Sequence, residues 1–227
     1  MAALYTWEAD MRDAAHVIES LGTRKPIPVL GHSKGGGMMN QLAEVLPHRV
    51  GAVINLDGIP NERGFTNQVD RSDVNALATE LSAWLDHRRK AGQMSRRADT
   101  IEGLAARRKL MNPRLSNEWL KYLVTVGARC DDDGWRWKID PTLRFGPSGA
   151  WRPEWSIPRL RGLHVPYLGV IGTVKEEMGW GTTPEEAFPI LPEGAEFHAL
   201  ADTGHFVHIE RPDYVAEITV DFLGRVL

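Results

Sequence analysis

Hydrophobic and polar positions near the start of the chain follow helical and strand spacing in turn. A helical pattern begins at Trp7 and ends before Gly22, and a short apolar run follows at 27–30. A second helical pattern covers 38–46, and 51–57 is a run of apolar and β-branched residues typical of a buried strand. Helices that alternate with strands across short connections indicate a parallel sheet.

The pattern changes after residue 58 and returns near the end of the chain. The long middle segment is charged and predicts helices, whereas buried strands are again predicted at 165–171 and 195–200, before a closing helix near Pro212. The fold class that we predict is α/β, with a mostly parallel sheet and helices on both faces. The chain divides into a first core part, a helical cap insertion and a second core part, at 1–58, 59–163 and 164–227.

Composition and charge limit what the chain can do. With 227 residues and 42% hydrophobic content, it can form one domain, or one domain with a large insertion. Its net charge of −3 argues against nucleic acid or an anionic membrane as its main partner, and we interpret the basic residues at 88–97 as a solvated helix face. The single cysteine, Cys130, and the absence of a long apolar run or signal peptide favour a cytoplasmic location.

A serine stands between the first predicted strand and the helix that follows it. The residues Gly31-His32-Ser33-Lys34-Gly35 form the pattern Gly-x-Ser-x-Gly, which in this setting is a nucleophile elbow. The turn must be strained so that the hydroxyl projects above the sheet, and we expect a Cβ to clash at both flanking glycines. The backbone N–H of Lys34 begins the helix, where it would stabilise an oxyanion.

A serine hydroxyl is a weak nucleophile until a neighbouring base removes its proton, so the elbow needs a histidine. Among the eight histidines, His205 lies in a loop directly after the last predicted strand, at the sheet edge where strand ends gather. His208 is the competing candidate. His32 adjoins Ser33 in sequence, but neighbouring side chains diverge, so we do not expect His32 to be the base.

The chain resembles the α/β-hydrolase family along nearly its whole length. The resemblance rests on the elbow, the strand at 53–57, the charged insertion, the strand at 165–172, and Gly204-His205 before the closing helix. It implies a Ser–His–acid triad in that chain order, which hydrolyses an ester or a related acyl bond without a cofactor or a metal. Because the nucleophile is a serine and not a carboxylate, the dehalogenase and epoxide-hydrolase chemistries of the family are disfavoured.

Three carboxylates compete for the acid position of the implied triad. The family usually carries this acid a few residues after the strand that ends here at Gly172. Glu176 is the candidate that we favour there, although its spacing is one residue longer than the common pattern. Asp57, which ends the strand after the elbow helix, is a position that some family members use, and Glu177 is the remaining alternative.

The four predicted strands match only the last four of the family's larger sheet. We therefore expect the N-terminal part of the sheet to be missing, together with the loop that supplies a second oxyanion N–H. Removing one such donor typically costs about a hundred- to a thousandfold in rate. The strand before Ser33 would then present an open apolar edge, available for self-association or for a second chain.

Three explanations account for the missing part. The chain is a fragment of a longer gene product, or a second chain completes it, or it is a shortened and catalytically inactive binding module. The first is the explanation that we favour.

Four tryptophans crowd a Pro- and Gly-rich part of the insertion: Trp135, Trp137, Trp151 and Trp155. They either fill the core beneath a loop or line an apolar pocket, and the second interpretation suggests a small apolar or aromatic substrate. The nearby stretch 131–134 resembles half of a calcium loop but lacks the spaced carboxylates. We therefore predict a turn there, not a metal site.

Overall fold

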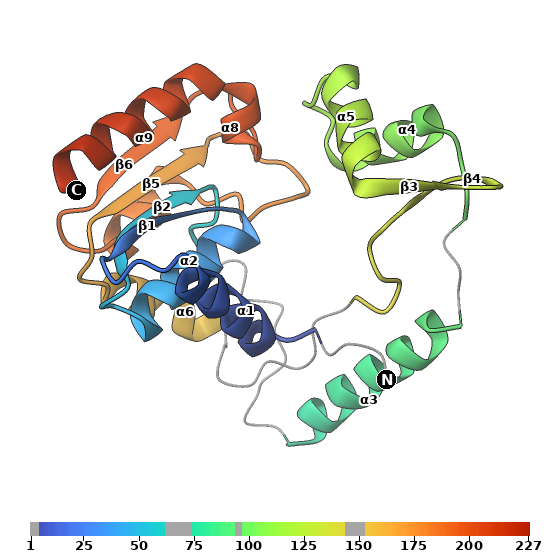
Figure 1. The fold of residues 1–227 in the computed structure, drawn as a ribbon, viewed down its shortest axis with the longest axis horizontal. Coiled ribbons are helices and arrows are strands. Elements are labelled where there is room, and N and C mark those ends of the chain that lie inside the picture. The colour runs from blue at the N-terminus through green and yellow to red at the C-terminus, as the bar shows by residue number, and fades with distance from the viewer. Residues whose placement is uncertain (1–4, 62–73, 94–96, 144–152) are drawn as a thin grey trace. The chain divides into compact units, whose positions relative to one another are not determined.

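The structure is a computed structural model that describes residues 5–61, 74–93, 97–143 and 153–227. The chain forms two compact units, which Figure 1 colours by position along the sequence. The sheet unit comprises Trp7–Gln68 and Gly149–Leu227. The helical unit comprises Met1–Thr6 and Val69–Ser148.

Four parallel strands make up the sheet of the sheet unit, in the order β1-β2-β5-β6. They are β1 (Ile27–His32), β2 (Val50–Leu56), β5 (Tyr167–Gly172) and β6 (Glu196–Leu200). The four predicted strands and the predicted parallel sheet are therefore confirmed. Because β2 and β5 lie between two other strands and are buried on both faces, their sequences are continuous apolar runs.

Helices cover both faces of this sheet (Figure 1). The first core cluster contains residues of α1 (Trp7–Ser20), α2 (Lys34–Val45), α6 (Pro153–Arg161), α7 (Pro184–Ala187) and the 3-10 turn Phe188–Ile190. The second cluster contains residues of α8 (Val207–Glu210) and α9 (Pro212–Val226). Val53 belongs to the first cluster, whereas its neighbours Ala52 and Ile54 belong to the second. This alternation is the two-residue period of a strand.

Local signals set where these helices begin and end. Gly22 lies just beyond α1 with a φ of +67°, a left-handed conformation that glycine adopts at little cost. The hydroxyl of Thr183 accepts a hydrogen bond from the backbone of Glu186, whose side chain accepts one from the Thr183 N–H in return. Pro212 begins α9, where its missing N–H has no helical partner to lose.

The helical unit contains three helices and a hairpin among its described residues. They are α3 (Val74–Ala91), α4 (Ile101–Met111), α5 (Asn117–Gly127), β3 (Ala128–Asp131) and β4 (Gly134–Trp137). The turn predicted at 131–134 is confirmed, since it joins two antiparallel strands. The hairpin itself was not predicted from the sequence. The cap boundaries, 59–163, stay a prediction.

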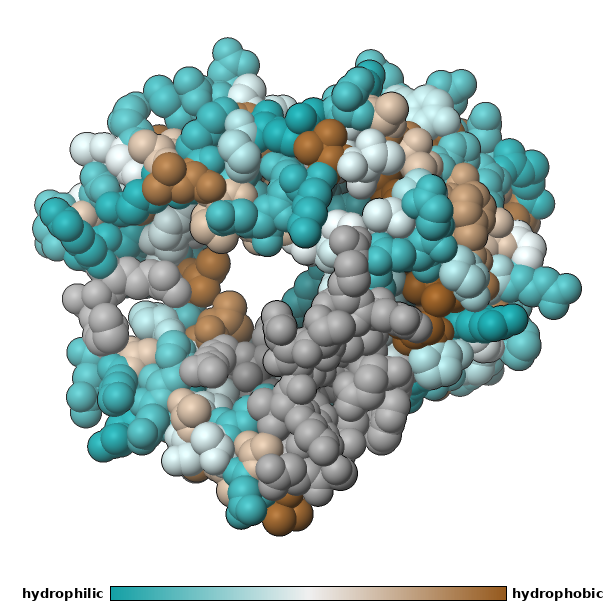
Figure 2. All heavy atoms as spheres, turned by 180° about the vertical axis from the view of Figure 1, so that it is seen from behind, coloured by the Kyte–Doolittle hydropathy of each residue, from teal (hydrophilic) through white to brown (hydrophobic). Residues whose placement is uncertain are grey.

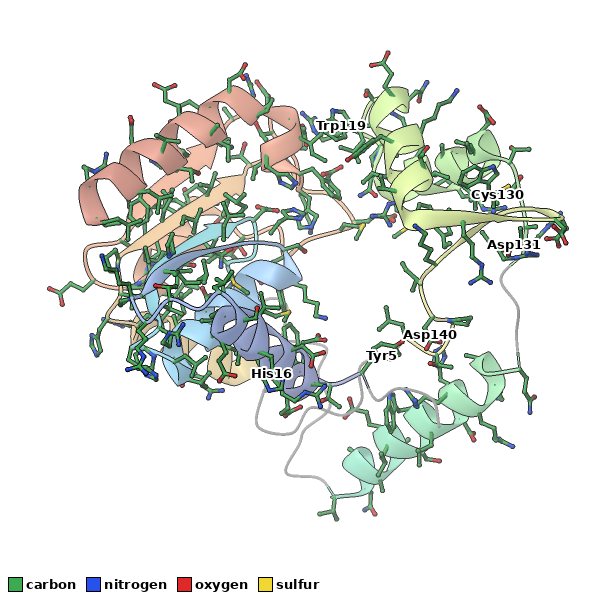
Figure 3. All side chains as sticks on the ribbon, viewed as in Figure 1. Tyr5, His16, Trp119, Cys130, Asp131 and Asp140 are labelled. Atoms are coloured by element: carbon green, nitrogen blue, oxygen red, sulfur yellow. The ribbon has the colours of Figure 1, made fainter. Side chains whose placement is uncertain are left out.

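Side-chain contacts tie the ends of the helical unit together. The hydroxyl of Tyr5 donates a hydrogen bond of 2.8 Å to Asp140, and Figure 3 shows the two side chains pointing toward each other. This bond is the main reason that the pKa of Tyr5 is raised.

The basic residues predicted to form a solvated helix face lie partly on α3. There Arg89 pairs with Asp86 at 2.9 Å and its side chain is 69% exposed, as a solvated face requires. Arg96, another member of the predicted basic face, lies outside the described residues.

The face drawn in Figure 2 is mainly hydrophilic. On the face drawn in Figure 2, apolar residues form separate brown patches among teal ones. None of the described helices combines the length and the apolar character that crossing a membrane requires.

Candidate active site

Ser33 lies directly after β1 and directly before α2, as the sequence predicted for the elbow. Its φ of 56° and ψ of −122° place its backbone in a left-handed region, which costs a residue with a Cβ about 1–2 kcal/mol. The Ser33 N–H donates to the carbonyl of Leu56 at 2.9 Å, and the Ser33 carbonyl accepts from the N–H of Gly36 at 2.9 Å. These two bonds hold the strained turn between the sheet and the helix.

The crowding at the elbow differs from what the sequence predicted. A Cβ on Gly31 would lie 2.2 Å from the carbonyl oxygen of Gly35, so glycine is required at position 31 as expected. A Cβ on Gly35 would meet nothing within 4 Å, and the expected clash at that position is wrong. The crowded residue is Gly36, where a Cβ would lie 2.4 Å from the side-chain oxygen of Asn55. The helix start turns Gly35 outward and Gly36 toward β2.

Asp57 lies at the end of β2, beside the elbow. Its φ is 52°, and its backbone N–H donates to the carbonyl of Val170 at 2.7 Å. One carboxylate oxygen, Oδ1, accepts the backbone N–H of Gly172 at 3.0 Å. The other, Oδ2, lies 2.6 Å from Nδ1 of His205. Both oxygens are therefore held, and the carboxylate is only 11% exposed.

His205 lies in the loop after β6, and its side chain is 2% exposed. A carboxylate only accepts hydrogen bonds, so the proton of a neutral ring sits on Nδ1 and leaves Nε2 unprotonated. Gly179 packs against the ring, since a Cβ there would lie 2.5 Å from Nδ1. Within the described part of the chain the Ser33 hydroxyl makes no hydrogen bond to this ring. Such bonds are often long in ligand-free sites and shorten when substrate binds.

Lys34 is the first residue of α2, where helical N–H groups and the positive end of the helix dipole lie. Its side chain turns toward α1. The ammonium group lies 2.6 Å from a carboxylate oxygen of Asp10 and 5.3 Å from the centre of the Trp7 ring. The charge of Lys34 is thus engaged with α1, while its backbone N–H adjoins Ser33.

Comparison with known proteins agrees with this arrangement of strands and helices. A model of the alpha/beta hydrolase family matches residues 2–218, which is most of the chain. The chain belongs to the alpha/beta hydrolase family. No curated protein matches it in sequence.

Several solved structures share the fold of this chain. A hypothetical protein from Pseudomonas aeruginosa PAO1 has 20% identity and a TM-score of 0.76, with 98% of this chain and 76% of that chain covered. An esterase from Mycobacterium tuberculosis has 19% identity and a TM-score of 0.65, with coverages of 97% and 68%. The thioesterase domain from the curacin biosynthetic pathway has 20% identity and a TM-score of 0.68, with coverages of 95% and 73%. Similarity at these identities shows the fold alone.

The carboxylate on the histidine ring is not the one that the sequence favoured. Glu176 lies near His205 but accepts its backbone N–H, at 2.6 Å, while the ring contacts Asp57. Glu177 is exposed. The segment after β5 therefore brings an acid to the histidine residue but not to the imidazole, and the alternative that we kept open, Asp57, occupies the ring position.

His32 makes a contact that its place in the sequence did not predict. Its Nε2 lies 2.8 Å from the carbonyl oxygen of His205, and its ring lies against those of His205, Phe206 and His208, with centres 4.5, 5.0 and 4.6 Å away. Burial lowers the pKa of His32 to about 4, so the ring is neutral near pH 7. No sequence signal pointed to this contact, because it depends on how a loop at the other end of the chain folds.

The remaining candidates are His208, which lies beside His32, and the four tryptophans. Burial also lowers the pKa of His208, and its Nδ1 makes no hydrogen bond within the described residues. Trp135 and Trp137 are partly buried on β4, whereas the side chains of Trp151 and Trp155 are outside what the structure describes. Among the residues described, no three His, Cys, Asp or Glu side chains gather where they could hold a metal ion.

Proposed function

We propose that this member of the family is a serine hydrolase that cleaves an ester or a related acyl bond of a small apolar substrate. Ser33 is the nucleophile, His205 is the general base, and Asp57 orients the imidazole. The observation that carries the proposal is the 2.6 Å contact between His205 Nδ1 and Asp57 Oδ2, beside a strained serine turn. The esterase and the thioesterase domain among the structural neighbours support the choice of acyl chemistry.

The proposed reaction has two halves. The Ser33 oxygen attacks the substrate carbonyl carbon while Nε2 of His205 takes the hydroxyl proton, and the carbonyl oxygen becomes an oxyanion. The protonated ring then gives its proton to the leaving alcohol or thiol, which leaves an acyl ester on Ser33. Water repeats the same steps on this ester, with Nε2 as base, and restores the enzyme while it releases the acid.

Electrostatics favour each charged species in turn. Proton transfer makes the imidazole cationic, and the carboxylate of Asp57, held by the Gly172 N–H, stabilises that cation without taking its proton. The oxyanion forms beside the start of α2, where the Lys34 N–H and the helix dipole favour negative charge. The strained Ser33 turn is the usual means of lifting a serine oxygen toward both groups.

A fluorophosphonate probe tests the proposal directly, because it phosphonylates only an activated serine. We expect the folded protein to be labelled and Ser33→Ala to lose all labelling. Ser20→Ala, at the exposed end of α1, is the matched control and should label like the wild type. If the folded protein is not labelled at all, the proposal is wrong and a non-catalytic binding module becomes the better description.

A further inference from the structure

Side chains hold both backbone polar groups of His205. Its N–H donates to Oε2 of Glu176 at 2.6 Å, and its carbonyl accepts from Nε2 of His32 at 2.8 Å. The preceding residue is held in the same way, since the N–H of Gly204 donates to Oε1 of Glu210 at 3.0 Å. Residues 203–205 of this loop are buried, so their backbone polar groups need protein partners, and for His205 both partners are side chains.

The backbone group that each side chain contacts determines whether that side chain donates or accepts the hydrogen bond. A carbonyl oxygen only accepts, so Nε2 of His32 carries a proton and donates it. The neutral ring that burial favours meets this need. A carboxylate only accepts, so Glu176 is the acceptor for the amide of His205. Hydrogen bonds to a charged acceptor are about twice as strong as neutral ones, which suits the short distance to Glu176.

The two side chains come from parts of the sheet that the elbow and the acid also use. His32 is the last residue of β1 and directly precedes Ser33, so it links the nucleophile to the histidine loop. Glu176 follows β5, the strand whose last residue, Gly172, donates to Asp57. The second oxygen of Glu176, Oε1, is buried and makes no hydrogen bond within the described residues. The bond from the His205 N–H to Oε2 is therefore the main polar contact of the Glu176 carboxylate.

We infer that His32 and Glu176 are positioning residues that hold the backbone of His205 in place for catalysis. The inference rests on the proposed function and deepens it. Asp57 fixes the rotation of the imidazole, but it leaves the loop that carries the ring able to shift. The two backbone contacts remove that shift, and a displacement of about 1 Å at a reacting group can cost about a hundredfold in rate.

Two matched pairs of variants separate these hydrogen bonds from packing. His32→Phe keeps an aromatic ring among its neighbours and loses the donor, whereas His32→Gln keeps an N–H donor at similar reach. Glu176→Ala loses the acceptor, whereas Glu176→Gln keeps a carbonyl oxygen and loses only the charge. Urea unfolding identifies any variant that fails to fold.

The first readout is the rate at which the fluorophosphonate probe labels Ser33, together with kcat and KM for p-nitrophenyl butyrate. We expect His32→Phe and Glu176→Ala to slow labelling by about 10- to 100-fold, with the loss in kcat and little change in KM. The two glutamine variants should have a labelling rate and a kcat close to those of the wild type.

The second readout does not need activity. The Nδ1 proton of His205 in a short bond to a carboxylate gives a downfield proton NMR resonance, which Asp57→Asn should abolish. We expect this resonance to move upfield or broaden in His32→Phe and Glu176→Ala, and to persist in the glutamine variants.

The outcomes distinguish the inference from the proposed function. Suppose that the wild type is labelled and that His32→Phe and Glu176→Ala match it in labelling rate and in the Nδ1 resonance. That result would overturn the inference and leave the proposed function standing. So would a His32→Gln variant as impaired as His32→Phe, because the ring and not the donor would then matter. If the folded wild type is not labelled, the proposed function fails, and the resonance then decides whether the two side chains hold His205.

Discussion

Ser33 and Asp57 share a left-handed backbone, with φ values of 56° and 52°, and they directly follow the neighbouring parallel strands β1 and β2. The carboxyl ends of parallel strands meet at one edge of the sheet, so the sheet presents both residues there. Aspartate adopts this conformation more readily than most residues, whereas serine does so at a cost. The strain therefore concentrates at the proposed nucleophile.

This strain predicts a difference between two variants that both lack the hydroxyl. Ser33→Gly removes the Cβ that the left-handed backbone disfavours, whereas Ser33→Ala keeps it. We expect the glycine variant to have the larger free energy of unfolding, by about 1 kcal/mol after the flexibility of unfolded glycine is allowed for. Urea unfolding measures the difference. An alanine variant of equal or greater stability would show that the turn is not strained.

The role of Asp57 predicts a large kinetic effect from a small change. Asp57→Asn keeps the shape and tolerates the positive φ, but it cannot stabilise the protonated ring of His205. We expect kcat/KM for p-nitrophenyl butyrate to fall by about 10³- to 10⁴-fold. Asp202→Asn is the matched control, since Asp202 also has a φ of 52° and is exposed, whereas Asp57 is the carboxylate that contacts the ring. A comparable loss in both variants would argue against the acid role.

The glycines of the elbow predict opposite effects of the same substitution at adjacent positions. Gly36→Ala places a Cβ 2.4 Å from the Asn55 side chain, and we expect it to destabilise the fold by about 1–3 kcal/mol. Gly35→Ala meets nothing within 4 Å and replaces a helical glycine, so its effect should be neutral or stabilising by up to about 1 kcal/mol. Denaturant midpoints of the two variants test this order, and a reversed order would contradict the crowding at Gly36.

Burial of His32 predicts a pH dependence of stability. Because its pKa falls from 6.5 to about 4 in the folded state, the unfolded chain binds a proton at higher pH than the folded chain does. His32 therefore leaves the free energy of unfolding unchanged above pH 6.5. As the pH falls toward 4, the unfolded chain takes up the proton first, and the free energy of unfolding falls by roughly 2 kcal/mol for this partly exposed ring.

The measurement compares urea unfolding of the wild type, His32→Gln and His48→Gln between pH 7 and pH 4. His32→Gln should lose less stability on acidification than the wild type. His48→Gln should parallel the wild type, because His48 is exposed in a turn. Equal slopes for all three proteins would show that His32 is not held neutral.

Sequence patterns predicted the elements that depend on neighbouring residues. The strand, serine turn and helix around Ser33 follow from an apolar run, a glycine pattern and helical spacing. The hairpin β3–β4 was missed because each strand has only four residues, too few for its alternation of apolar and polar residues to stand out. Helix α6 was missed because two of its nine residues are prolines, one of them inside the helix, where proline is strongly disfavoured.

The choice of acid could not be predicted from local pattern. Asp57 and His205 are 148 residues apart, and their contact depends on the path of two loops. Glu176 does reach the same histidine, so the sequence located the right neighbourhood. A shift of a few ångströms decides whether a carboxylate contacts the backbone or the ring of His205. Spacing along the chain does not resolve such a shift.

The order β1-β2-β5-β6 gives β1 a single neighbour among the described strands, and Leu30 within it is 52% exposed. Water can reach one margin of this strand, so its local opening costs less than that of a strand enclosed on both sides. The proposed attacking oxygen thus directly follows an edge strand, a position in the sheet that β1 shares with β6. Any contact that covers this margin would steady the oxygen without touching the catalytic groups, and would thereby tune turnover from outside the active site.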